Sequence, residues 1–126
     1  MAKLAVLHHE EGVRVNPDCL VALYAELGEA GAERVVARAM EEMNARLSEM
    51  QRFADDGDLV GLMRSARIVV KMADQIGLTS FTMVALDVIA ATHAGDHAGQ
   101  AATLARLLRI GDRSLNAVWD LRDMTI

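Results

Sequence analysis

Residues 58–77 read DLVGLMRSARIVVKMADQIG, and this stretch decides the fold. Asp58 is a good helix N-cap, and Gly77 is a typical residue just past the end of a helix. Between them, apolar residues recur at steps of three and four, which predicts one helix with a single buried stripe. The predicted stripe comprises Leu59, Leu62, Met63, Ala66, Val69, Val70, Ala73 and Ile76.

The same reasoning predicts helices on both sides of this stretch. Asn16 caps a short helix that Gly28 ends, and a long helix follows over residues 32–54. Two more helices are predicted over residues 79–94 and 96–122. Their short connections make neighbouring helices antiparallel, so the predicted fold is all-α: an antiparallel four-helix bundle with a short leading helix, in one domain over residues 1–126. Predicted core positions outside residues 58–77 include Leu20, Leu27, Val36, Met40, Met43, Leu47, Met50, Phe53, Phe81, Val84, Leu86, Val88, Ile89, Ala101, Leu104, Leu108, Leu115 and Val118.

Residues 1–15 differ from the rest of the chain. Two apolar segments, 4–7 and 12–15, flank the polar run His8-His9-Glu10-Glu11. This pattern predicts a small hairpin or an extended arm. Adjacent residues of an extended segment point to opposite sides, so we expect no metal site in the polar run.

Composition excludes several classes of function. The net charge is −5 and aromatic residues make up 3% of the chain, which argues against nucleic acid as a partner. No apolar run approaches the roughly 18 residues of a membrane span, and no signal peptide is readable at the N-terminus. Cys19 is the only cysteine, which fits a reducing compartment. We therefore expect a cytoplasmic protein that does not bind membranes.

Three short segments, together with the order of the elements, resemble the histidine-containing phosphotransfer (HPt) domains over residues 16–122. The segments are 57–66, 76–78 and 95–97, which read GDLVGLMRSA, IGL and GDH. HPt domains carry His-x-Leu-Lys-Gly on their active helix, with the histidine ten residues before a closing glycine. Counting back from Gly77 places Arg67 at the position of the phosphate-accepting histidine. The resemblance implies a bundle that docks the receiver domain of a response regulator through this helix.

The substitution at Arg67 removes the chemistry of the family. Phosphotransfer needs a neutral imidazole nitrogen that attacks an aspartyl phosphate, whereas arginine stays protonated and has no lone pair for that attack. Lys71 stands where the family has glycine and fills the space through which the partner approaches. We therefore expect no catalytic residue, no cofactor and no enzymatic activity.

The side of the predicted helix opposite its buried stripe is basic, with two aliphatic residues inserted. It consists of Val60, Arg64, Arg67, Ile68, Lys71 and Gln75. A docking surface for an acidic partner and an ordinary solvated helix face both fit this pattern. The leading hypothesis is a non-catalytic HPt-like signalling protein that binds a receiver domain or a related partner without accepting phosphate.

The sequence also fits two alternative functions. The first is a homodimeric interaction or structural module unrelated to phosphorelay, because the last helix carries apolar residues beyond one stripe; we expect most of Leu107, Ile110, Trp119 and Leu121 to line the core. The second is active phosphotransfer through another histidine, either His93 or His97. These two histidines are four residues apart, but the turn at Gly95 separates them, which disfavours a shared metal site.

Overall fold

The chain from Pro17 to Thr125 is helical except at Gly28 and in three short connections. The computed structural model describes residues 16–125, with side chains through Gly111. The helices are α2 (Pro17–Asp56), α3 (Leu59–Gln75), α4 (Thr79–His93) and α5 (His97–Thr125), and residues 16–125 contain no strand. The predicted all-α class is therefore confirmed for this range. The arm expected over residues 1–15 lies outside it.

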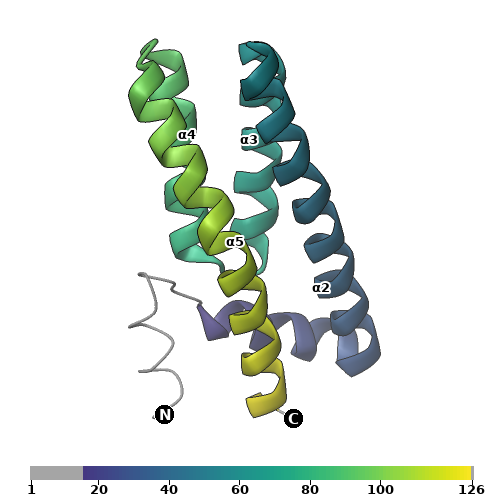
Figure 1. Cartoon of the computed structure of the whole chain (residues 1–126). Helices are drawn as coiled ribbons and strands as arrows, with labels where there is room; N and C mark the ends of the chain where they lie inside the picture. Colours follow the sequence, from purple (N-terminus) through teal and green to yellow (C-terminus); the bar gives the residue numbers. More distant parts are fainter. Residues whose placement is uncertain (1–15, 126) are drawn as a thin grey trace.

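Gly28 divides α2 into a short leading part and a long part. Its backbone angles, φ 75° and ψ 172°, are not helical, and a glycine adopts them without strain. Figure 1 shows the leading part crossing the end of the bundle while the long part runs along it. The short helix predicted between Asn16 and Gly28 is confirmed, and the Asn16 side chain accepts a hydrogen bond from the Asp18 backbone N–H at 3.0 Å. The helix resumes directly after Gly28, a few residues earlier than predicted.

The leading part is fixed to the turn between α3 and α4. The Asn16 backbone N–H donates to the Gly77 carbonyl at 2.7 Å, and Leu20 is buried. Gly77 has φ 79°, and a Cβ added to it would lie 2.6 Å from the Asn16 carbonyl oxygen. Glycine at this position therefore supplies both the left-handed backbone and the room for the leading helix to approach.

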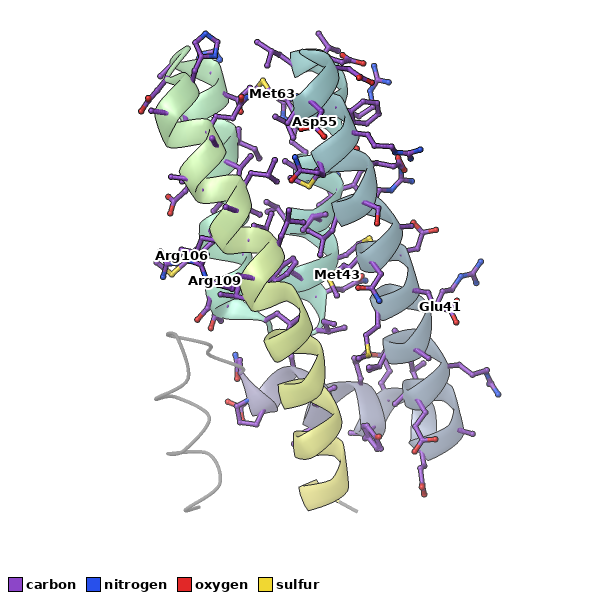
Figure 2. All side chains as sticks on the ribbon, in the orientation of Figure 1. Glu41, Met43, Asp55, Met63, Arg106 and Arg109 are labelled. Atoms are coloured by element: carbon purple, nitrogen blue, oxygen red, sulfur yellow. The ribbon has the colours of Figure 1, made fainter. Side chains whose placement is uncertain are left out.

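The helices pack in the cyclic order α2, α3, α4, α5, each antiparallel to the next (Figure 1). The contact of α5 with α4 is extensive, whereas its contact with α2 is smaller. Figure 2 shows Met43 pointing between the helices and Glu41 pointing away from them. The core consists of Leu20, Val36, Met40, Met43, Leu47, Met50, Leu62, Ala66, Val69, Ala73, Ile76, Leu78, Phe81, Val84, Ala85, Val88, Leu104, Leu107 and Ile110. Leu107 and Ile110 thus line the core, as expected, while Trp119, Leu121, Leu115 and Val118 lie beyond the described side chains.

Some predicted core residues are exposed. Leu59 is 38% exposed because it is the first residue of α3, where no preceding turn of that helix covers it. Leu86 is 49% exposed because it lies opposite the stripe of α4 that contains Phe81 and Val88. Ala101 is exposed on α5, since Leu104 and Leu107 occupy its inward side, and Leu27 is exposed just before the kink of α2. The angular position on the helix accounts for the exposure of Leu86 and Ala101, and the position at a helix end or kink accounts for that of Leu59 and Leu27.

The turns at the other end of the bundle share one design, Gly-Asp-x-x-Gly. The Asp58 side chain accepts from the Gly61 backbone N–H, and Asp96 accepts from that of Gly99, both at 2.9 Å. Gly57 and Gly95, which precede these caps, have φ 73° and 71°. Their backbone N–H groups donate to carbonyl oxygens in the last turns of the preceding helices and so end those helices. The caps predicted at Asp58 and Asp96 are confirmed. They begin the two helices that run back toward the leading helix.

Asp58→Ala should lower the free energy of unfolding by about 1 kcal/mol, because the Gly61 N–H loses its acceptor. Chemical denaturation followed by circular dichroism measures this change. Asp56→Ala is the control: Asp56 is exposed at the last position of α2, where a negative charge opposes the helix dipole. In the control variant, the free energy of unfolding should stay unchanged or rise slightly. An equal loss of free energy in both variants would contradict the assignment of Asp58 as the cap.

Candidate functional site

The basic side of α3 faces solvent. One side of this helix is buried and carries Leu62, Ala66, Val69 and Ala73. The opposite side carries the candidate residues. The structure places five of the six candidates, Val60, Arg64, Arg67, Lys71 and Gln75, in exposed positions. We call these five residues the α3 outer face. Val60 is 69% exposed, the most exposed of the large hydrophobic side chains described.

Ile68 does not belong to this face. It is half-buried, because its position on the helix turns it toward α2. Gly61, seven residues earlier, lies against Phe53 of α2, where an added Cβ would be 2.9 Å from the ring. Met72, four residues later, lines a groove shared with α2. Residues spaced by four and seven share one side of a helix, so Ile68 lies on the flank of α3 that α2 covers.

The three cations of the α3 outer face make no ion pair with the described side chains. Two ion pairs within α2 join Arg46 to Glu42 at 3.6 Å and to Glu49 at 3.1 Å, and neither involves the α3 outer face. Arg64, Arg67 and Lys71 therefore present their charge to solvent. Exposed charges of this kind contribute little to stability.

Arg67 lies at the midpoint of α3, eight residues from each end of the helix. Its guanidinium group is a fixed cation with five N–H donors, and it has no acceptor. It can bind a carboxylate or a phosphate through two parallel hydrogen bonds, but it cannot become a covalent acceptor. The arrangement supports recognition of an anionic group without transfer of phosphate.

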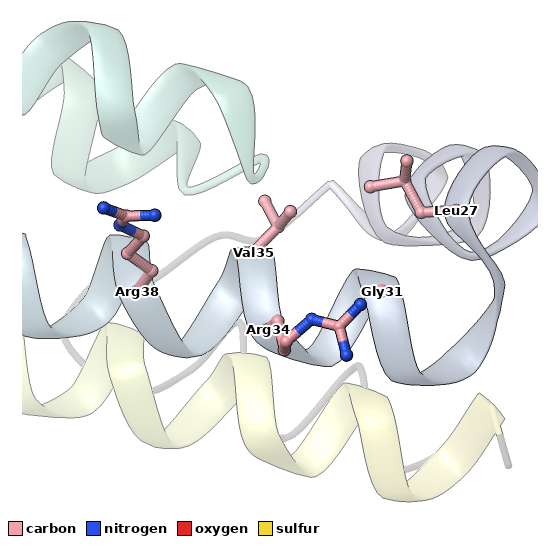
Figure 3. Close-up of a pocket in the computed structure, with 5 residues that line it drawn as sticks. All are labelled: Leu27, Gly31, Arg34, Val35 and Arg38. Atoms are coloured by element: carbon pink, nitrogen blue, oxygen red, sulfur yellow. The ribbon is translucent and has the colours of Figure 1, made fainter.

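A groove that sequence reasoning missed adjoins this face. Two hollows of about 390 and 360 Å³ lie along the first half of the long part of α2 and share Val35 and Arg38. Figure 3 shows these two side chains on one side of α2, with Leu27 at the far end of the hollow. The second hollow extends to Met72 and to Gln75 of the α3 outer face. The sequence signal was the pair Arg34 and Arg38 at a spacing of four residues, although only the packing of α2 on α3 makes a groove beside it.

The other candidate residues do not converge on a site. His93 is the last residue of α4 and His97 is the first of α5, and both are exposed. No group of three or more histidine, cysteine or acidic side chains in the described range could hold a metal ion. Cys19 is partly buried against the turn at Gly77, where an added Cβ would lie 3.2 Å from its sulfur. The residues His8, His9, Glu10 and Glu11 lie outside the described range.

Comparison with known proteins adds no relative to this picture. No protein-family model matches the chain, and no curated protein or solved structure is significantly similar to it. Among the helices described, none combines the length and the apolar character that a membrane crossing requires.

Proposed function

We propose that this protein is a non-catalytic, HPt-like docking module that binds the receiver domain of a response regulator, or a related signalling partner, without accepting phosphate. The observation that carries the proposal is the α3 outer face, where three exposed cations at the middle of one helix make no ion pair with the side chains of residues 16–111. Support also comes from the order of the elements, a short leading helix followed by antiparallel helices joined by short turns.

The character of this face matches the character of the proposed partner. Receiver domains present an acidic pocket around their phosphorylated aspartate. Arg64, Arg67 and Lys71 supply positive charge, and Val60 supplies apolar contact at the end of the same face. Exposed charges of this kind raise the rate of association more than they add to affinity, and salt screens them.

The residue at the centre of the face determines the outcome of docking. A histidine in this position would take the phosphoryl group from the partner, whereas Arg67 can only neutralise its charge. A protein that occupies the acidic pocket in this way competes with active phosphotransfer domains. The proposed role is therefore that of a decoy or an adaptor in a phosphorelay.

Arg67→Glu should weaken binding to a receiver domain by at least about tenfold, because one attraction becomes a repulsion in a partly desolvated contact. Arg67→Glu combined with Lys71→Glu should abolish detectable binding. The measurement is a calorimetric or fluorescence titration of the full chain against purified receiver domains. Arg52→Glu, an equal change of charge at an exposed position of α2, is the matched control and should leave the affinity within a factor of about two.

Two results would contradict this proposal. The first is the absence of saturable binding to every receiver domain tested. The second is acid-labile phosphate on this chain after incubation with a phosphorylated receiver, which would point to His93 or His97 as an active acceptor.

Raised salt should weaken the binding of the wild-type chain to a receiver domain and have a smaller effect on the binding of the Arg67→Glu variant.

A further inference from the structure

The outer side of α4 is apolar although it faces solvent. Phe81, Val84 and Val88 bury one side of this helix, but Met83 and Leu86 on the other side are 62% and 49% exposed. Apart from the terminal His93, the only charged residue of α4 is Asp87. A helix that is apolar on both sides is normally covered on both sides. Packing within residues 16–111 covers only one of them.

The residues of this outer side follow a regular spacing. Thr79, Met83, Leu86, Ala90 and His93 are separated by four, three, four and three residues, and all five are exposed. This alternation is the spacing of a helix seam that packs along a second helix. We call these five residues the α4 seam. None of them belongs to the α3 outer face.

We propose that the α4 seam pairs with the same seam of a second copy of this chain, with the two α4 helices antiparallel. In this antiparallel pair, Met83 of one copy lies opposite Ala90 of the other copy. The two Leu86 side chains lie beside each other on the twofold axis. A large side chain thus meets a small one at both ends of the contact, as close packing requires. A parallel pair would instead place Met83 on Met83 and leave a gap between two Ala90 methyl groups.

The charges beside the seam fit the same arrangement. The Gln100 side-chain amide donates to the Thr92 hydroxyl at 3.0 Å, which fixes the register of α5 against α4. Arg106 is six residues after Gln100 on α5, and Leu86 is six residues before Thr92 on α4. Because the two helices are antiparallel, Arg106 lies level with Leu86. Figure 2 shows Arg106 projecting beside α4. Asp87 of the second copy arrives at this level in the antiparallel pair, so each Arg106 gains a carboxylate partner.

The length of α4 sets the strength of this contact. Its 15 residues span about 22 Å, so one pair of helices gives an interface smaller than that of most stable dimers. We therefore expect a dimer that dissociates reversibly on dilution. Each dimer would present two α3 outer faces, since the seam leaves them uncovered.

Sedimentation equilibrium of the full chain tests the proposal. We expect a monomer–dimer equilibrium for the wild type and at least about tenfold weaker association for Leu86→Glu, because two carboxylates would meet on the twofold axis. Val21→Glu is the matched control: Val21 is also an exposed aliphatic residue, on the leading part of α2, and the dimer should persist. Circular dichroism shows whether each variant is folded. A monomeric wild type, or a Leu86→Glu variant that dimerises like the wild type, overturns the proposal.

Disulfide trapping tests the antiparallel register in a Cys19→Ala background, which removes the only cysteine. Leu86→Cys should form a covalent dimer under mild oxidation, and Met83→Cys should cross-link to an Ala90→Cys partner more rapidly than to itself. Rapid cross-linking of Met83→Cys to itself would show a parallel pair and contradict the inferred register. Failure of receiver binding would leave these outcomes unchanged, because the α4 seam and the α3 outer face share no residue.

Discussion

Leu62→Ala is expected to lower the free energy of unfolding by about 3 kcal/mol, a value within the range for deleting a buried leucine side chain. Leu62 is fully buried on α3, in the core that α2, α3 and α4 share. The loss combines the transfer of the removed methyl groups with the cavity that a close-packed bundle cannot refill. Urea denaturation followed by circular dichroism gives the free energy from a two-state fit.

Leu59→Ala is the control for this measurement, with the same change of residue type on the same helix. Because Leu59 lies at the exposed edge of α3, its truncation should cost less than about 1 kcal/mol. The sequence pattern places both residues in one stripe, whereas the structure separates them. Similar losses at the two positions would contradict the orientation of α3.

Gly77→Ala is expected to lower stability by about 2–4 kcal/mol and to detach the leading helix. The strain of a non-glycine residue at φ 79° accounts for about 1–2 kcal/mol of this loss. The rest comes from the new methyl group, which would lie 2.6 Å from the Asn16 carbonyl oxygen and 3.0 Å from the Cys19 Cβ. Backbone atoms cannot move away as a flexible side chain can, so the contact of the leading helix with the turn must open.

Gly95→Ala separates the two causes of this loss. Gly95 has φ 71° but no atom within 4 Å of an added Cβ, so the variant carries the strain without the collision. It should lose only about 1–2 kcal/mol. Hydrogen exchange of the backbone amides in residues 20–27 gives a second readout, since these amides should exchange faster in Gly77→Ala than in Gly95→Ala. Equal exchange in both variants would show that the leading helix does not depend on this contact.

The α3 outer face and the α4 seam lie on different helices of the bundle, and we propose a different contact for each of them. The first side is charged and fits a transient, salt-sensitive encounter with an acidic partner. The second is apolar and fits a reversible contact between two copies of the chain. In a dimer, two docking faces would act together, which raises the apparent affinity for a dimeric partner when both sites can be reached at once.

The sequence by itself determined the helices and most of their ends. Asn16, Asp58 and Asp96 cap helices through their own side chains, and Gly28 and Gly77 end helices through left-handed backbone angles. These signals act over a few residues, so they can be recognised without knowing what lies elsewhere in the chain. The periodicity of residues 58–77 was equally local, and it placed Arg64, Arg67 and Lys71 on the exposed side of α3.

Only the tertiary structure decided which apolar residues are covered. Ile68 is half-buried because α2 lies along its flank of α3, while Leu86 is exposed because no other part of the described chain reaches the outer side of α4. The groove beside Arg38 and the contact of Gly77 with Asn16 likewise join segments far apart in the sequence. The physical reason is that periodicity gives the angle of a side chain around its own helix, whereas burial depends on which other helices occupy that angle.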